Sequence, residues 1–192
     1  MIRSLYNWTL RLAETRYALW ALAIVSFAES SVFPIPPDVL MIPMILARPG
    51  RAWLIAAVAL VASVLGGLFG YWIGAELYQS VGRPVLEFYG KDAYFEEFRQ
   101  TYNAWGAWAV LIAGVTPFPY KVITILSGAT GLNLTVFMVA SLVARGLRFF
   151  LVAALLWKFG APIRAFIERR LGLLFTIFVL LLLGSYILVR YL

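Results

Sequence analysis

The segment SSVFPIPPDVLMIP, residues 30–43, places four prolines and an aspartate inside an apolar stretch that extends from residue 17 to residue 47. Proline lacks the backbone N–H that a helix needs, so the cluster must interrupt any helix that enters it. The residues after the break, 38–47, would form a helix about 15 Å long, whereas the hydrocarbon core of a bilayer is about 30 Å thick. This arm is too short to cross alone. The stretch therefore predicts a re-entrant hairpin, which enters and leaves a membrane on one side.

Apolar runs of this kind recur along the chain and define its class. Of 192 residues, 63% are hydrophobic and 13% are charged, which excludes an ordinary soluble domain. Cysteine and histidine are absent, so disulfides, thiol catalysis and His-ligated metals are excluded, and we expect no metal and no cofactor. The 16 Lys and Arg against 9 Asp and Glu are typical of loops that face anionic lipid, so no nucleic acid is expected as a partner. The sequence predicts an all-α polytopic membrane protein with a single membrane domain, residues 1–192.

The apolar stretches and the polar segments between them predict seven elements. Residues 1–16 carry Leu5, Trp8 and Leu12 on one face, which indicates an amphipathic helix on the membrane surface. Residues 80–103 are mixed in charge and indicate an interfacial loop or helix, with a helix beginning near Asp92. The other predicted elements are re-entrant hairpin 1, residues 17–47; a spanning helix, 52–79; re-entrant hairpin 2, 104–132; and two spanning helices, 134–157 and 171–190.

The second broken stretch repeats the plan of the first. Pro-x-Pro occurs at residues 34–36 and 117–119, an offset of 117 − 34 = 83 that also aligns Asp38 with Lys121. One spanning helix separates the two hairpins, so they would enter from opposite faces as an inverted-topology repeat whose broken segments meet at mid-membrane. A kinked, tilted spanning helix is the alternative for each broken stretch. The predicted helix breaks are at Pro34, Pro36, Pro37, Pro117 and Pro119.

Five ionisable side chains lie inside the apolar stretches, away from their ends. Each would cost roughly 3 kcal/mol at a lipid-facing helix centre, so they must face one another or a wet cavity. Two of them, Arg145 and Arg148, are three residues apart and share a helix face. The repeat predicts in addition that Asp38 lies close to Lys121. The five residues are Glu29, Asp38, Lys121, Arg145 and Arg148.

The signs of these charges favour a site for an anion. Three cations against two carboxylates leave one positive charge, and the planar fork of arginine suits phosphate. We predict that Lys121, Arg145 and Arg148 bind a phosphate, and that Glu29 and Asp38 gate the site or carry protons. A purely architectural cluster of ion pairs is the alternative.

The spanning helix at 52–79 carries Gly66, Gly70 and Gly74 at four-residue spacing. Such a stripe lets two helix backbones approach closely, so these residues are predicted to pack helices rather than take part in chemistry. Ser63 and Tyr71 of the same helix are candidates to line a cavity.

Four motifs together resemble the DedA family of the VTT, or SNARE-associated, membrane domain, and above all its short YqaA-like branch. The motifs are FAESSVFPIPPDVLMIP, GGLFGYWIG, AGVTPFPYKVITILSGATGL and ARGLRF, and the resemblance covers about residues 17–157. By position, Glu29 and Asp38 match acidic residues of the family, while Arg145 and Arg148 fall on the helix after the second hairpin. The resemblance implies two opposed re-entrant hairpins and a role in moving lipids across membranes.

The function implied by the resemblance is that of a lipid transporter of the flippase or scramblase kind, not of an enzyme. Its partner would be a membrane lipid with an anionic phosphate headgroup, such as a polyprenyl phosphate or a phospholipid, with coupling to protons as an option. The resemblance implies a multi-pass protein of the bacterial inner membrane, with its N-terminus in the cytoplasm. A secondary transporter of a small soluble ion is the alternative function, and homo-oligomerisation is left open.

Overall fold

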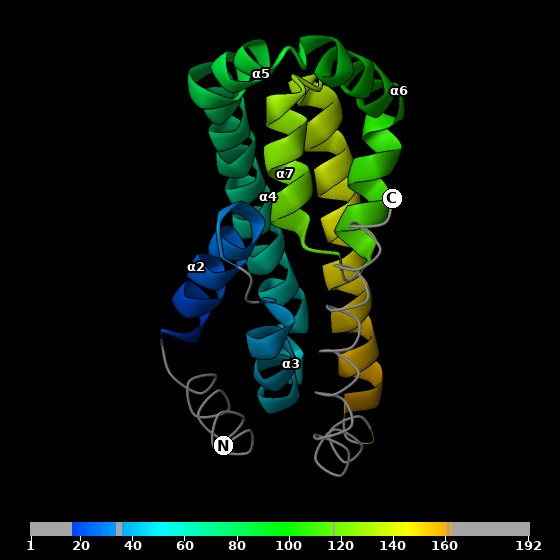
Figure 1. Ribbon diagram of the computed structural model, residues 1–192. Coiled ribbons are helices and arrows are strands. Elements are labelled where there is room, and N and C mark those ends of the chain that lie inside the picture. Colours follow the sequence, from blue (N-terminus) through cyan, green and yellow to red (C-terminus); the bar gives the residue numbers. More distant parts are fainter. Residues whose placement is uncertain (1–16, 34–35, 117, 161, 163–192) are drawn as a thin grey trace.

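The computed structural model describes residues 17–33, 36–116, 118–160 and 162, and this part of the chain is helical, with no strand (Figure 1). The predicted surface helix at 1–16 and the predicted spanning helix at 171–190 lie outside the described residues. The helices are α2, Ala18–Ser31; α3, Asp38–Ala47; α4, Ala52–Leu77; α5, Arg83–Tyr89; α6, Asp92–Val115; α7, Tyr120–Ala129; and a helix at Leu134–Gly160. A 3-10 turn at Pro49–Arg51 precedes α4, and a π-helical turn at Tyr78–Gly82 joins α4 to α5.

Two of the helices are long and apolar enough to cross a membrane. One is the helical run Pro49–Tyr89, which contains α4, and the other is Leu134–Gly160. α2 and α3 are shorter apolar helices. The prediction of an all-helical protein with apolar helices of membrane-spanning length is confirmed for the described residues.

Helix breaks fall at both proline clusters. α2 ends at Ser31 and α3 begins at Asp38, with Pro37 at its N-cap. In the second cluster, α6 ends at Val115 and α7 begins after Pro119. The missing N–H of proline costs nothing at a helix N-terminus, where the first amides have no partner within the helix, so each cluster ends one helix and starts the next.

The chain between α4 and the second break differs from the predicted segmentation. α6 begins at Asp92, as predicted, but it continues without interruption to Val115. The part of the predicted interfacial segment from Asp92 onward and the first arm of hairpin 2 therefore belong to one helix. Residues 93–115 contain no proline, and Gly106 faces the side chain of Leu132, so nothing in this stretch forces a break.

The two helix pairs occupy opposite halves of the bundle. α2 and α3 lie beside the N-terminal half of α4, and α6 and α7 lie toward its C-terminal half, so the pairs turn back toward opposite ends (Figure 1). Each pair has its own buried cluster. Leu22, Met41, Ile45 and Phe149 belong to one, which joins α2, α3, α4 and the helix Leu134–Gly160. The other joins α6, α7 and the same long helix, and contains Val110, Tyr120 and Phe137.

The glycines of α4 lie where the two helix pairs meet this helix. A Cβ on Gly66 would overlap the backbone of Phe27 in α2, and one on Gly74 would overlap the backbone of Ile125 in α7. Between them, Gly70 faces both the side chain of Thr124 and the carbonyl of Ser30. The stripe thus seats α2 and α7 against one face of α4 at distances that a larger residue would not allow.

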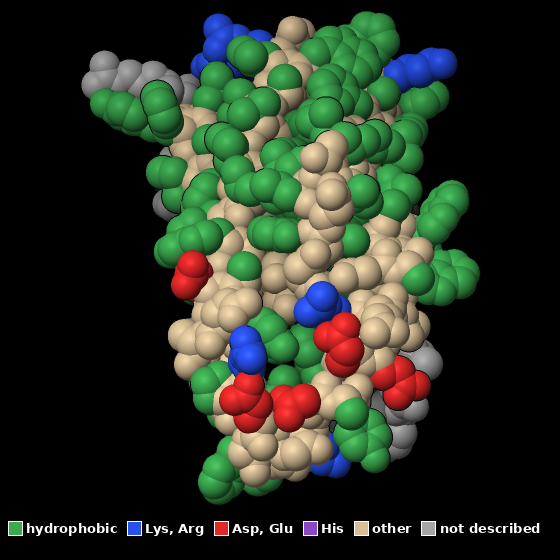
Figure 2. Space-filling model, turned by 90° about the horizontal axis from the view of Figure 1, so that it is seen from above, with side chains coloured by type: hydrophobic (Ala, Val, Ile, Leu, Met, Phe, Trp, Pro, Cys, Tyr) green, Lys and Arg blue, Asp and Glu red, His purple; other side chains and the backbone are tan. Residues whose placement is uncertain are grey.

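Charged side chains gather at the end of the bundle formed by α5 and the start of α6 (Figure 2). Two ion pairs lie there within single helices, Arg83–Glu87 at 2.8 Å and Arg99–Glu96 at 3.4 Å. Exposed aromatic side chains, among them Phe88 and Tyr89, accompany them. This mixture of charged and aromatic groups is typical of a surface at the boundary between lipid and water.

Candidate functional site

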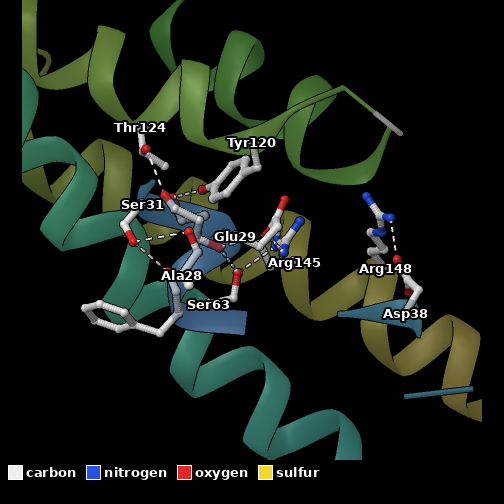
Figure 3. Close-up of polar contacts among 12 residues, drawn as sticks. Ala28, Glu29, Ser31, Asp38, Ser63, Tyr120, Thr124, Arg145 and Arg148 are labelled. Carbon is white, nitrogen blue, oxygen red and sulfur yellow. Dashed lines mark hydrogen bonds and ion pairs between the residues drawn. The ribbon is translucent and has the colours of Figure 1, made fainter. Parts of the chain in front are cut away.

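A buried salt bridge joins Glu29 of α2 to Arg145 of the helix Leu134–Gly160 (Figure 3). Arg145 Nη2 donates to Glu29 Oε2 at 2.6 Å, and the two side chains are only 1% and 12% exposed. Arg145 also lies between two aromatic rings, with its guanidinium carbon 4.8 Å from the centroid of Tyr120 and 4.6 Å from that of Phe149. This cation is therefore both paired and enclosed, as burial of a charge requires.

Two serines complete the polar surroundings of Arg145. Its Nε donates to Ser63 Oγ at 2.7 Å, and the Oγ atoms of Ser63 and Ser30 are 2.7 Å apart. Ser30 in turn donates to Glu29 Oε2 at 3.1 Å. Ser63 lies near the middle of α4, and Arg145 near the middle of Leu134–Gly160. The cluster consequently lies at the depth where unpaired charge would be most costly in a membrane.

A second salt bridge joins Asp38, at the start of α3, to Arg148 (Figure 3). Arg148 Nη2 donates to Asp38 Oδ2 at 2.6 Å, and Arg148 Nη1 donates to the carbonyl of Thr116 at 3.0 Å. Their side chains are 20% and 19% exposed, so this pair is more accessible than the first. Asp38 Oδ1 is buried and has no hydrogen-bond partner among the described residues. The second pair is thus more exposed than the first, and it leaves a buried carboxylate oxygen unpaired.

The breaks of the two helix pairs contact each other beside these charges. Lys121 Nζ donates to the carbonyl of Val32 at 3.4 Å, and Thr124 Oγ1 donates to the carbonyl of Ser30 at 2.9 Å. Ser30 and Val32 lie at the end of α2, while Lys121 and Thr124 lie at the start of α7. Side chains of α7 therefore supply hydrogen bonds to carbonyls that the end of α2 leaves free.

The salt-bridge partner of Asp38 is Arg148 and not Lys121. Asp38 pairs with Arg148, and Lys121 has no salt bridge to a described carboxylate. The expectation treated the two hairpins as mirror halves that meet through matching positions. Instead, both carboxylates turn toward the helix Leu134–Gly160, where Arg145 and Arg148 share one face. An arginine reaches farther and can donate to two acceptors at once, which favours it over the more exposed lysine.

Some residues of this site are absent from the sequence-based prediction. Thr116 and Tyr120 contact the arginines and Ser30 donates to Glu29, yet small polar and aromatic residues are common in such a chain and carry no distinctive spacing. Ser63 was a candidate to line a cavity, and it instead accepts a hydrogen bond from Arg145. Their positions in the sequence could have pointed to two of them, because Ser30 neighbours an acidic residue and Tyr120 follows a proline break.

The arrangement has a definite charge balance. The two salt bridges are neutral overall when ionised, and Lys121 adds one positive charge beside them. Within the described residues no group of three or more Asp or Glu side chains could hold a metal ion. An arginine in such a salt bridge can exchange one hydrogen-bond acceptor for another. A phosphate oxygen is a suitable replacement for a carboxylate oxygen in such a contact.

Comparison with known proteins places this fold and site in a family. The model of the VTT domain matches residues 35–158. An uncharacterized protein of Haemophilus influenzae is 37% identical over 169 residues, which cover 86% of this chain and 88% of that protein. A related uncharacterized protein of Histophilus somni is 36% identical over the same length, with the same coverage. No solved structure matches the chain.

The matched region contains the end of the first break, the second break, Asp38, Lys121 and both arginines, so it includes most of the site described above. The VTT domain is a membrane domain linked to membrane transport and is not an enzyme class. The sequence resemblance and the match agree over most of the described residues. The chain belongs to the VTT domain family, which is the DedA family.

Proposed function

We propose that this protein moves a phosphate-bearing lipid across the bacterial inner membrane, as a flippase or scramblase. The headgroup would pass between the breaks of the two helix pairs while the acyl or prenyl chains stay in the bilayer. Polyprenyl phosphates and phospholipids both have the required chemistry. The proposal places the N-terminus in the cytoplasm.

The proposal includes two re-entrant hairpins of opposite orientation, α2–α3 and α6–α7, in an inverted-topology repeat. What supports it is the length of the arms, since α3 and α7 have ten residues each and a spanning helix needs about 20. The opposite directions of the two pairs also support it (Figure 1). Backbone that is not helical is tolerated at membrane depth where protein or water covers it, and the contacts between the breaks provide such cover.

The observation that carries the proposal is the incomplete salt bridge of Asp38 and Arg148. A cation at membrane depth that is one-fifth exposed, and whose carboxylate partner has an unpaired oxygen, is prepared to change partners. A phosphate oxygen would replace Asp38 as the acceptor for Arg148, and Lys121 would add a second positive contact. Protonation of Asp38 would release Arg148 and couple lipid movement to protons. Asp38 is the gate in this scheme.

A test uses purified protein in liposomes that contain fluorescent phosphatidylglycerol in both leaflets. Dithionite added outside bleaches the outer leaflet, and further loss of fluorescence reports movement of lipid from the inner leaflet. We expect this further loss with the wild-type protein and not with Arg148→Gln. Labelled glucosylceramide, whose headgroup has no phosphate, is the matched control and should not move faster than in empty liposomes.

The alternative function is a secondary transporter of a small soluble ion, which the same cations would suit. Liposomes loaded with radiolabelled inorganic phosphate distinguish the two. Loss of the trapped phosphate without lipid movement would replace the lipid proposal by the ion proposal. Movement of labelled glucosylceramide as fast as phosphatidylglycerol would show that the phosphate is not recognised.

A further inference from the structure

The hydrogen bonds around Arg145 form a closed ring in which the donor of every bond is fixed. A guanidinium group only donates, so its bonds to Glu29 Oε2 and Ser63 Oγ both run outward from Arg145. Each serine hydroxyl has a single proton to give. The proton of Ser30 goes to Glu29 Oε2, so the 2.7 Å contact between the two serines requires Ser63 to donate to Ser30. Donation from Arg145 through Ser63 and Ser30 thus ends at Glu29, which also accepts directly from Arg145 and so closes the ring.

Every hydroxyl in this ring both accepts and donates, which leaves no polar atom of either serine without a partner. The ring joins three helices, because Glu29 and Ser30 lie on α2, Ser63 lies on α4 and Arg145 lies on Leu134–Gly160. The guanidinium carbon also lies over the aromatic rings of Tyr120 and Phe149, and the Arg145 side chain is only 1% exposed. A phosphate could reach Arg145 only if the enclosure opened and the ring broke.

The neighbouring salt bridge has none of these properties. Asp38 Oδ1 lacks a partner, and both Asp38 and Arg148 are partly exposed. The remaining bond of Arg148 goes to a backbone carbonyl, that of Thr116, at the break before α7. Two arginines on the same helix face therefore differ in whether they can change partners.

We propose that Ser30 and Ser63 are positioning residues that hold Glu29 and Arg145 in a fixed structural ring throughout transport, and that Arg148 is the arginine that meets the phosphate headgroup. The role given to Arg148 rests on the proposed function. It also gives Arg145 and Glu29 a role different from the phosphate binding and gating expected from the sequence. The Glu29–Arg145 pair is then architectural, and the Asp38–Arg148 pair takes part in transport.

Paired neutral substitutions test the division of roles, because removing both partners leaves no stranded charge. In the liposome assay, we expect Glu29→Gln with Arg145→Gln to keep the rate of phosphatidylglycerol movement within about threefold of wild type. We expect Asp38→Asn with Arg148→Gln to lower it by more than about tenfold. Both proteins must elute as folded species from gel filtration in detergent. A folded Glu29→Gln, Arg145→Gln protein that moves no lipid would overturn the proposal.

A second pair of substitutions keeps all charges and opens only the ring. Ser30→Ala with Ser63→Ala should lower the thermal unfolding midpoint in detergent while lipid movement below that midpoint persists. Ser31→Ala is the matched control, since the hydroxyl of Ser31 is equally buried but donates to the Phe27 and Ala28 carbonyls of its own helix. It should lower the midpoint less. If the Glu29→Gln, Arg145→Gln protein does not fold, the Ser30→Ala, Ser63→Ala protein provides the test instead. Loss of lipid movement in that protein, if it is folded, would overturn the proposal.

The serines must act through Arg145 if they are positioning residues. The serine substitutions should therefore have little further effect on the midpoint in the Glu29→Gln, Arg145→Gln background, a non-additivity that a double-mutant cycle measures. Fully additive shifts would overturn the ring. A wild-type protein that moves no lipid would remove the proposed function, whereas this cycle, which measures stability alone, would still support or overturn the ring.

Discussion

Gly74 of α4 and Ile125 of α7 are in backbone contact, so that a Cβ on Gly74 would occupy the place of the Ile125 carbonyl. The reciprocal contact is equally close, because a Cβ on Gly128 of α7 would overlap the carbonyl of Tyr71 in α4. Each helix thus presents a glycine to the backbone of the other. The contact fixes where the second helix pair sits along α4.

We expect Gly74→Ala to destabilise the protein by about 1–3 kcal/mol, because the added methyl group meets backbone, which cannot rotate away. Gly146→Ala is the matched control, since its Cβ would lie 3.6 Å from a side-chain atom of Leu60, an ordinary contact. It should stabilise by up to about 1 kcal/mol through helix propensity. Thermal unfolding in detergent measures both. Equal effects of the two changes would contradict the close packing of α4 and α7.

The partners of Asp38 can be identified by double-mutant cycles on stability. Asp38→Asn combined with Arg148→Gln should give a coupling energy of at least about 1 kcal/mol, because the two side chains are in direct contact. Asp38→Asn combined with Lys121→Gln should be additive within about 0.5 kcal/mol, since no salt bridge joins them. The opposite result would restore the pairing that the repeat in the sequence suggested.

A substitution at Ser26 should increase the stability of the protein rather than decrease it. The side chain of Ser26 is fully buried in α2, and its Oγ has no hydrogen-bond partner in the part of the chain that the structure describes. Removal of an unsatisfied hydroxyl should relieve a cost, so we expect Ser26→Ala to stabilise the protein by about 1 kcal/mol. Ser63→Ala should destabilise, because it removes the acceptor for Arg145 Nε. A loss of stability in Ser26→Ala would indicate that this hydroxyl has a partner, such as an internal water.

The orientation of the hairpins can be tested with single cysteines, because the native chain has none. Gly50 and Gln100 are exposed, and a Cβ at Gly50 would meet no other atom within 4 Å. With re-entrant hairpins, an impermeant thiol reagent added to intact cells should label Gln100→Cys and leave Gly50→Cys unlabelled until the membrane is opened. Labelling of Gly50→Cys alone would mean that both broken stretches span the membrane.

The helix breaks were predictable from the sequence, whereas the charge partners were not. A proline acts on its own backbone and on the turn before it, so its effect can be inferred locally at Pro37 and Pro119. The partner of Asp38 depends on how α3 and the helix Leu134–Gly160 are rotated about their axes. That rotation is set by packing against α4, which involves contacts between residues far apart in the chain.

For the buried charges, too, the sequence predicted one property and not another. The cost of a charge at a helix centre was enough to predict that Glu29 and Arg145 face protein rather than lipid. It did not separate the enclosed Arg145 from the accessible Arg148, although the two are only three residues apart. The difference comes from Tyr120, Phe149 and Ser63, whose residue types give no sign of a contact with arginine.

The sequence separation within the salt bridge of Glu29 and Arg145 affects how the protein can be made. Arg145 follows Glu29 by 116 residues. At about 5–20 residues per second, the ribosome needs roughly 6–23 s to supply Arg145 after Glu29. During that interval the Glu29 carboxylate of α2 has only nearby hydroxyl groups as hydrogen-bond partners. It must therefore remain near water or be protonated. A nascent chain that stops before residue 145 should therefore leave α2 unable to settle against α4, and it would be a ready substrate for membrane proteases.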